Sequence, residues 1–204
     1  MRKLLPILSF LLILSANTRA EEAPKTLTPE EQFVSDLGNQ IITLIRSTNK
    51  LEEKRDHFRV LLKANFDMKS IGKFVLSRFW KQATDAQKDQ FLKLFEQNMV
   101  DTYTSQFDQY KDETMVVNGS RRDEGDGAVW VNSKVQGPAR DPVSIRWKLY
   151  DVNGKFKVYD IHVNEVSMCI THRSEYASII GKHGGSIDGL IKDMQENKAA
   201  RKDA

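Results

Sequence analysis

The side chains with the widest chemical range in this 204-residue chain are four histidines and one cysteine. His57, His162, His172 and His183 lack the His-Glu-x-x-His spacing and the neighbouring cysteine pair that are typical of a metal site. Cys169 is the only cysteine, so no disulfide forms within the chain. These residue types and spacings predict a protein with no metal ion and no cofactor.

Covalent and acid–base catalysis have little support in the sequence. Cys169 lies in an apolar run, which is the setting of a buried and inert thiol. No Gly-x-Ser-x-Gly elbow occurs, and the glycines of 181–185 follow a predicted helix, which indicates a helix end and not a phosphate-binding loop. If the protein were an enzyme, Asp160 and His162 would be the two candidates for acid–base catalysis in a pocket. Because covalent and acid–base catalysis have so little support, we predict no catalytic residue.

Phenylalanine and methionine are the more informative residues, with 10 and 6 copies respectively. Many of them lie on segments that are expected to converge. Flexible methionines and aromatic rings suit an adaptable apolar pocket, and they suit a filled core equally well. The pattern alone leaves both interpretations open.

The charge balance argues against nucleic-acid binding. The chain has 31 Lys and Arg against 28 Asp and Glu, but Arg2, Lys3 and Arg19 all lie in the first twenty residues. Without those three, 28 basic residues face 28 acidic ones. A neutral chain has no general attraction for phosphate backbones.

The N-terminus has the three parts of a secretory signal. A basic start is followed by an apolar run over 4–14, and Thr18 and Ala20 are small residues at the −3 and −1 positions of a cut after Ala20. The run is shorter than the ~20 apolar residues that span a bilayer. We predict a cleavable signal peptide over 1–20 and export to a Gram-negative periplasm. A flexible leader over 21–27, a single domain over 28–194 and a polar tail over 195–204 then follow.

Helix signals fill the first half of that domain. Thr28 with Glu31 and Thr84 with Gln87 are capping boxes that start two long helices. Between them, patterns predict a helix over 51–64 and a short one over 67–80. The helix after Thr84 has Phe91, Phe95, Met99, Tyr103 and Phe107 at steps of four.

Strand signals follow, with apolar and polar residues in alternation. We predict four strands near 114–118, 128–136, 143–150 and 156–170, with Asn153-Gly154 as a tight hairpin turn. The apolar phase flips at Asp160-Ile161, which indicates a bulge or a sharp bend, and it returns at Val166, Met168 and Ile170. Helical turns over 173–180 and 187–194 close the chain. This order predicts an α+β fold in which helices wrap a strongly bent antiparallel sheet, a cone able to enclose a cavity.

Several strings, in this order, resemble the MlaC family of periplasmic phospholipid-shuttle proteins, also called toluene-tolerance auxiliary proteins. They are Phe66-Asp67-Met68, the run over 71–80, Ala83-Thr84, Val158-Tyr159-Asp160-Ile161, Val166-Ser167-Met168, Arg173-Ser174-Glu175-Tyr176 and the run over 184–191. Each string is short, but the ordered set spans nearly all of the chain after the signal. Glu165 stands where the family pattern usually has glycine, and we expect it to alter the local bend or to place a carboxylate near the pocket rim.

The resemblance implies a cone related to the nuclear transport factor two fold, with bound phospholipid as cargo. It also implies two partners, an outer-membrane lipoprotein complex and the substrate-binding domain protein of an inner-membrane ABC transporter. Such a carrier would maintain the lipid asymmetry of the outer membrane.

A lipid carrier must enclose the acyl chains of its cargo. A diacyl lipid has roughly 30 methylenes at ~0.8 kcal/mol each, on the order of 20 kcal/mol in water. The short helix over 67–80, which contains Gly72, is our candidate for a movable wall. The residues that we expect to contact the chains are Phe74, Val75, Phe95, Met99, Val131, Val143, Ile145, Trp147, Val163, Val166 and Met168.

Two other classes of function stay open at this point. A cone-shaped enzyme acting on a hydrophobic substrate would need an acid–base residue deep in the pocket, and Asp160 or His162 would have to fill that role. A chaperone or binding module for exported hydrophobic polypeptides would need an open groove instead of a closed cavity. Detected turnover would favour the enzyme, and peptide binding without lipid would favour the chaperone.

Overall fold

A computed structural model describes residues 26–48, 50–110, 112–138 and 140–202, so the predicted signal peptide lies outside the described residues. The helices are α1 (Pro29–Arg46), α2 (Leu51–Asn65), α3 (Met68–Leu76), α4 (Phe79–Gln82), α5 (Asp85–Thr104), η1 (Phe107–Gln109), α6 (Met168–Lys182) and α7 (Ile187–Lys202). The strands are β1 (Thr114–Arg122), β2 (Val129–Gly137), β3 (Arg140–Val152), β4 (Lys155–Val163) and β5 (Val166–Ser167).

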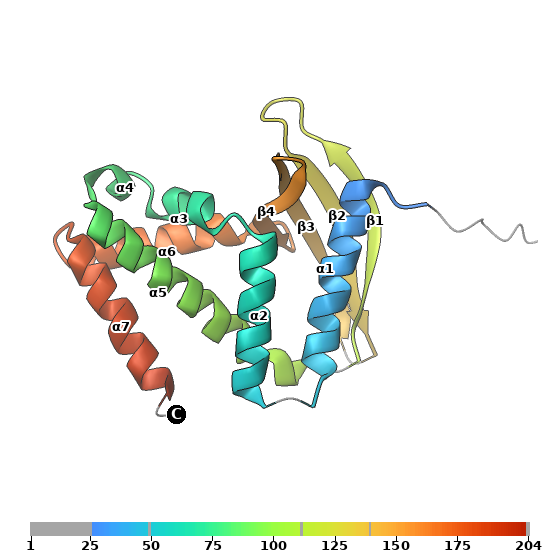
Figure 1. The fold of residues 1–204 in the computed structure, drawn as a ribbon, viewed down its shortest axis with the longest axis horizontal. Coiled ribbons are helices and arrows are strands. Elements are labelled where there is room, and N and C mark those ends of the chain that lie inside the picture. The colour runs from blue at the N-terminus through green and yellow to red at the C-terminus, as the bar shows by residue number, and fades with distance from the viewer. Residues whose placement is uncertain (1–25, 49, 111, 139, 203–204) are drawn as a thin grey trace, which may run out of the picture.

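The sheet is antiparallel with the strand order β1-β2-β3-β4-β5. Figure 1 shows α1 lying against this curved sheet, while α2 to α7 form a second group to the left of α1. The predicted α+β class and the helix-wrapped bent sheet are confirmed. Sequence patterns found four strands, and the fifth is a two-residue strand that pairs with the end of β4.

The capping residues act as predicted. The Thr28 side chain accepts a hydrogen bond from the Glu31 backbone N–H, and Thr84 does the same for Gln87. Thr and Ser at these positions satisfy N–H groups that have no partner in the first helical turn. The starts of α1 and α5 therefore follow from local sequence.

The predicted bulge in β4 is confirmed. Lys148 pairs with Asp160, but its neighbour Leu149 pairs with Val158, so Tyr159 is an extra residue on β4. The extra residue changes the phase, and Ile161 faces the same side of the sheet as Val158. This bend lets the end of β4 meet α6.

The prediction that a strand continues through Met168 and Ile170 is wrong. A helix, α6, begins at Met168 instead, because the Ser167 side chain accepts a hydrogen bond from the Ile170 backbone N–H. The apolar residues of this stretch fit a strand and the first turn of a helix equally well, and Ser167 was the cap that decided between them.

Two helix predictions also need correction. The short helix over 67–80 is two helices, α3 and α4, because Ser77 between them has φ 54°. A side chain in that left-handed region ends a helix. The last helix, α7, continues to Lys202, beyond the predicted end of that helix at 194.

Two clusters of buried side chains hold the fold together. One joins α1 to the sheet through Val34, Leu37, Val131 and Leu149. The other lies among α2, α3, α5, α6 and α7 and includes Phe91, Phe95 and Tyr176. None of the helices in the described part of the chain is long and apolar enough to cross a bilayer.

Replacing Glu165 by glycine should stabilise the protein by about 0.5–1 kcal/mol. Asn164 and Glu165 form the two-residue turn between β4 and β5 and have φ 46° and 67°, which costs a residue with a side chain ~1–2 kcal/mol. The change removes an exposed ion pair with Arg146 at 2.5 Å, worth ~0–1 kcal/mol. Thermal unfolding of Glu165→Gly beside Glu165→Ala tests this, because alanine loses the ion pair and keeps the strain. A lower melting temperature for the glycine variant would contradict the prediction.

Candidate functional site

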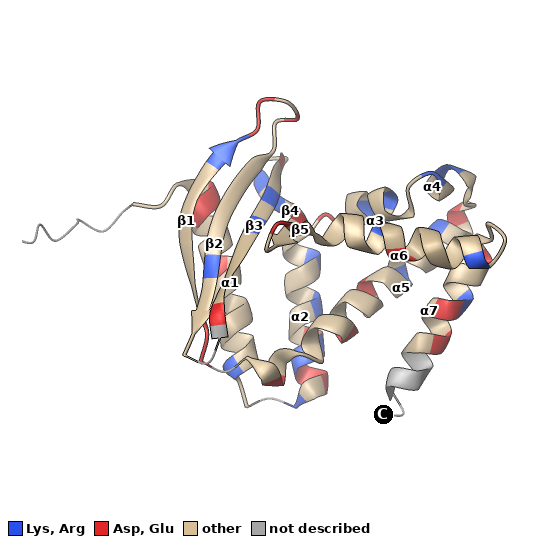
Figure 2. Ribbon diagram, turned by 180° about the vertical axis from the view of Figure 1, so that it is seen from behind, with Lys and Arg blue, Asp and Glu red and all other residues tan. Residues whose placement is uncertain are grey.

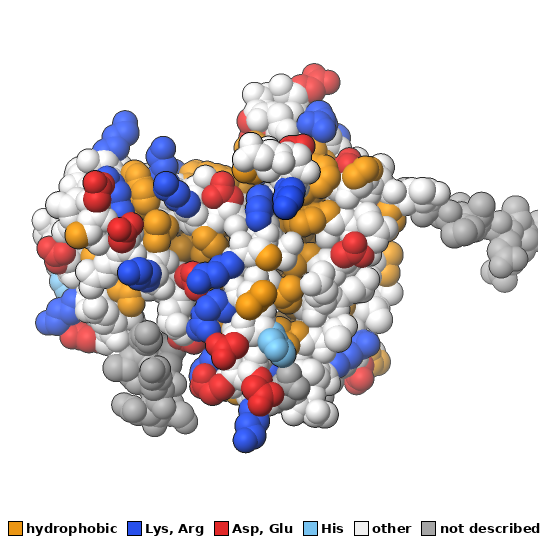
Figure 3. All heavy atoms as spheres, in the orientation of Figure 1, with side chains coloured by type: hydrophobic (Ala, Val, Ile, Leu, Met, Phe, Trp, Pro, Cys, Tyr) orange, Lys and Arg blue, Asp and Glu red, His pale blue; other side chains and the backbone are white. Residues whose placement is uncertain are grey.

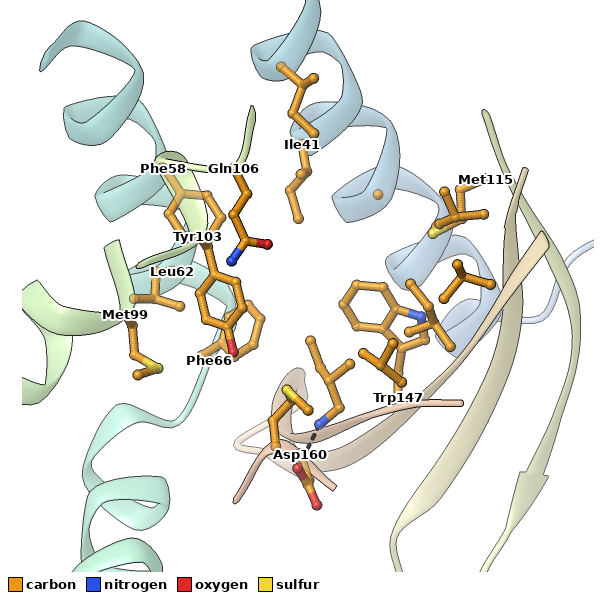
Figure 4. Close-up of a pocket in the computed structure, with 18 of the residues that line it drawn as sticks. Ile41, Phe58, Leu62, Phe66, Met99, Tyr103, Gln106, Met115, Trp147 and Asp160 are labelled. Atoms are coloured by element: carbon orange, nitrogen blue, oxygen red, sulfur yellow. Dashed lines mark hydrogen bonds between the residues drawn. The ribbon is translucent and has the colours of Figure 1, made fainter. Parts of the chain in front are cut away.

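An apolar cavity of about 560 Å³ lies between the two clusters of buried side chains. One wall consists of α1 and the sheet, and the other consists of α2, the start of α3, α5, η1 and the start of α6. Figure 4 shows Trp147 and Met115 entering from the first wall, and Phe58, Leu62 and Met99 from the second. A space of this size lies within the ~300–1,000 Å³ range of ligand pockets.

The sheet wall is made by alternate residues of neighbouring strands. Ser133 pairs with Ile145 and Val131 pairs with Trp147, so these four side chains share one face. The Trp147 indole N–H donates a hydrogen bond to the buried Ser133 hydroxyl at 2.9 Å. That bond satisfies the polar end of the tryptophan, and its ring is left to form apolar wall.

The helical wall is held by stacked aromatic rings. Phe91 stacks on Phe95 with centroids 5.8 Å apart, and Tyr176 meets both rings edge-on. Gly72 of α3 supports the same wall, because a Cβ at this position would lie 2.4 Å from the Leu92 side chain of α5. The helices that enclose the cavity are therefore closely packed behind it.

Two polar side chains extend into the cavity, one from the last turn of α5 and one from the short segment between α5 and η1. Figure 4 shows Tyr103 and Gln106 pointing inward, and neither side chain has a hydrogen-bond partner among the described residues. Burial raises the pKa of the Tyr103 hydroxyl, so it stays protonated and can donate a hydrogen bond at neutral pH. The cavity therefore offers a few polar contacts in an apolar enclosure.

Asp160 lies at the cavity edge and is fully engaged within the protein. Its carboxylate accepts hydrogen bonds from the Ile161 and Cys169 backbone N–H groups at 2.8 and 3.0 Å. It also accepts one from the Ser167 hydroxyl at 2.6 Å and lies 3.1 Å from His162 Nε2. The carboxylate therefore fastens the start of α6 to the bulge of β4.

The remaining candidates for chemistry are also structural. Burial raises the pKa of the Cys169 thiol, which leaves almost no thiolate at neutral pH. The His162 ring packs against Trp130 with centroids 4.8 Å apart, and His162 is not among the cavity residues. Within the described residues, no group of three or more His, Cys, Asp or Glu side chains is placed to hold a metal ion.

The structure brings together most of the residues that the sequence suggested for contact with acyl chains. Seven line the cavity: Phe95, Met99, Val143, Ile145, Trp147, Val163 and Met168. Whether they touch a lipid stays a prediction.

The other four predicted residues lie outside the lining. Val75 is buried among the helices, and Val131 is buried between α1 and the sheet. Phe74 packs against Tyr159 and the guanidinium of Arg173. Val166 is 55% exposed, because the turn before it and the helix after it direct its side chain away from the cavity. The Glu165 carboxylate meets Arg146 and does not line the cavity.

Several lining residues were missed although the sequence held a signal for them. Ile41, Ile42 and Ile45 widen the apolar stripe of α1 beyond the residues that face the sheet core. The series at steps of four on α5 continues past Met99 to Tyr103, which also lines the cavity. When the apolar stripe of a helix is wider or longer than its packing against one neighbour needs, it indicates a second apolar neighbour.

The fold and the cavity define a class of protein: a bent sheet wrapped by helices that encloses a space for a large, mainly apolar ligand. The family profile described as "MlaC protein" matches residues 35–196. The chain belongs to the MlaC family, as the resemblance in its sequence indicated.

Individual relatives agree with this assignment. The chain is 24% identical to the "Intermembrane phospholipid transport system binding protein MlaC" of Haemophilus influenzae, over 97% of this chain and 94% of that protein. It is 23% identical to the "Toluene tolerance protein ttg2D" of Pseudomonas putida, over 68% of this chain and 64% of that protein. A Ralstonia solanacearum phospholipid-binding protein, solved with a phospholipid, has the same fold with a TM-score of 0.75, 23% identity and coverage of 84% of this chain and 97% of that one.

Proposed function

We propose that the protein is a non-catalytic periplasmic carrier of glycerophospholipids. It would move lipid between an outer-membrane lipoprotein complex and the substrate-binding domain protein of an inner-membrane ABC transporter, and so maintain outer-membrane lipid asymmetry. The observation that carries the proposal is the apolar cavity of about 560 Å³ between the sheet and the helices. Export by the signal peptide predicted over 1–20 supports the periplasmic location.

The relatives support a phospholipid as the cargo. The Haemophilus influenzae protein is described as the binding protein of an intermembrane phospholipid transport system. The Ralstonia solanacearum protein, which shares the fold, was solved with a phospholipid. A common fold and a cavity of suitable chemistry make the same cargo class the simplest expectation for this chain.

The cavity suits transport because it replaces water around the acyl chains. Exposure of a diacyl lipid costs on the order of 20 kcal/mol at ~0.8 kcal/mol per methylene. The walls of the cavity are mainly isoleucine, valine, methionine, phenylalanine and tryptophan side chains. Flexible methionines such as Met99, Met115 and Met168 allow the walls to fit chains of different length.

The state of Asp160 and Cys169 argues against an enzyme. A general base must be free to accept a proton from a substrate, but the Asp160 carboxylate already binds four donors of its own chain. A nucleophilic cysteine needs a lowered pKa, and that of Cys169 is raised by burial. These features favour a carrier over a cone-shaped enzyme.

The direct test is to identify what the protein holds after export. The mature chain is purified from a bacterial periplasm without detergent, extracted with organic solvent and examined by lipid mass spectrometry. We expect phospholipid in an amount close to one molecule per protein. A folded protein that is empty, and that stays empty with labelled vesicles, would overturn the proposal. Turnover of a hydrophobic substrate would then point to the enzyme, and peptide binding to the chaperone.

A further inference from the structure

The segment from α3 to α4 has an unusual charge distribution. Lys69, Lys73, Arg78 and Lys81 are exposed, and no Asp or Glu occurs between Met68 and Thr84. Figure 2 shows α3 and α4 carrying blue residues and no red ones. Because basic and acidic residues balance in the chain that follows the predicted signal, this concentration of cations is a local feature.

A fifth cation and two apolar side chains extend this surface onto β5 and α6. The Arg173 guanidinium lies over the Phe74 ring of α3, 5.4 Å from its centroid. Ile170, one helical turn before Arg173, is 57% exposed, and Val166 is 55% exposed. Figure 3 shows basic side chains over α3 and α4 with apolar ones between them. We name these seven residues the basic face: Val166, Ile170 and the five cations Lys69, Lys73, Arg78, Lys81 and Arg173.

Asp67 and Glu175, which are close in sequence to cations of the basic face, have other partners. Asp67 accepts a hydrogen bond from the Ser70 backbone N–H and so caps α3. The Glu175 carboxylate lies 3.3 Å from His172 Nδ1. Within the described residues, no ion pair involves any of the five cations.

The basic face is also the outer side of a cavity wall. Met68 and Ile71 of α3 line the cavity, while Lys69 and Lys73 of the same helix face solvent. A partner on the basic face would therefore lie against the helix that closes the cavity on this side.

We propose that the basic face docks on an anionic phospholipid bilayer. The inference rests on the proposed function, because both proposed partner complexes belong to membranes, and docking on the bilayer would hold the carrier beside them. Three of the five cations are lysines, which are depleted in protein–protein interfaces but are attracted to anionic headgroups as strongly as arginines. Ile170 and Val166 add apolar side chains of a size that can enter the headgroup region.

Vesicle binding by the lipid-loaded mature protein tests the proposal. Vesicles of phosphatidylcholine alone are compared with vesicles that contain one third phosphatidylglycerol, by co-sedimentation at low and high salt. We expect binding to the anionic vesicles only, and its loss in high salt. Each lysine near an anionic surface raises the partition about fivefold. The double variant Lys69→Glu/Lys73→Glu should therefore bind at least about 25-fold more weakly.

A matched variant controls for net charge. Lys50→Glu/Lys134→Glu changes the charge equally at exposed positions just before α2 and on β2, and it should bind more strongly than the basic-face variant. Melting curves establish that both variants fold. Equal binding of the wild-type protein to neutral and anionic vesicles, or equal binding of the two variants to the anionic vesicles, would overturn the proposal. The proposal would also be overturned if the wild-type protein did not bind the vesicles and the basic-face variant failed to deliver lipid to an acidic acceptor protein. That result would indicate a protein partner on this face.

Lipid analysis of the same samples separates this proposal from the proposed function. A loaded protein that binds neither vesicle keeps the carrier function and loses the docking surface. An empty protein that binds only anionic vesicles loses the carrier function and keeps a membrane-binding face.

Discussion

Ile145→Glu is expected to empty the cavity and to leave the fold intact. Ile145 is partly exposed, and its side chain lines the cavity from β3. A carboxylate there can be hydrated in the empty protein, so we expect a loss of only about 1–2 kcal/mol in the free energy of unfolding. With acyl chains around it, the same charge would be desolvated at a cost of several kcal/mol. Co-purified phospholipid should therefore fall at least about tenfold.

The matched change, Val131→Glu, should unfold the protein. Val131 lies on the same face of the sheet, and its strand partner is Trp147, two residues from Ile145. It is fully buried against α1 and does not line the cavity, so a charge there has no access to water. A cost of several kcal/mol is a large part of the ~5–15 kcal/mol that stabilises a typical domain.

Two measurements on each variant decide the outcome: thermal unfolding by circular dichroism, and phospholipid per protein by mass spectrometry. Ile145→Met keeps the volume and the apolar character, so it should resemble the wild-type protein in both. If Ile145→Glu unfolds as Val131→Glu does, the space is ordinary core. If Ile145→Glu folds and keeps its lipid, the cargo lies elsewhere.

This pair of residues also shows how far sequence can predict the site. Val131 and Ile145 were both predicted to contact the acyl chains, and the structure places both on one face of the sheet. Which of them meets a helix and which meets the cavity depends on where α1 crosses the sheet. That position is set by long-range packing and leaves no local pattern.

The fold was more predictable because its main signals are local. The capping boxes at Thr28 and Thr84 and the Asn153-Gly154 turn decide element boundaries from a few neighbouring residues. At Met168 the local signals conflicted, because a short apolar run fits two periodicities. Val166 was misplaced for the same reason, since its predicted orientation assumed that the strand continued.

Asp160→Ala, at the edge of the cavity, is expected to destabilise the protein strongly. The change leaves the Ile161 and Cys169 backbone N–H groups and the Ser167 hydroxyl without their acceptor in a buried region. An unsatisfied buried donor costs ~1–3 kcal/mol, so we expect a loss of about 3–5 kcal/mol in the free energy of unfolding. The start of α6 should also loosen from β4, and lipid retention should fall with it.

Asp160→Asn is the matched variant, because the amide oxygen can still accept the two backbone N–H groups. The amide nitrogen can donate to the Ser167 hydroxyl, so a loss of only about 1 kcal/mol is expected. Urea unfolding and lipid mass spectrometry are measured for both variants. If Asp160 serves only to hold α6 to β4 in a carrier, lipid retention should follow stability. The Asp160→Asn variant should then be close to the wild-type protein, and the Asp160→Ala variant far below it.

An enzyme in which Asp160 is the general base predicts a different order. Asparagine has no basic carboxylate, so Asn and Ala would then be equally inactive whatever their stability. An alanine variant as stable as the wild-type protein would contradict the fastening role itself. Because four donors of its own chain converge on this carboxylate, the structural outcome is the one we expect: the group that most resembles a catalytic residue here closes the cavity by holding α6 to the sheet.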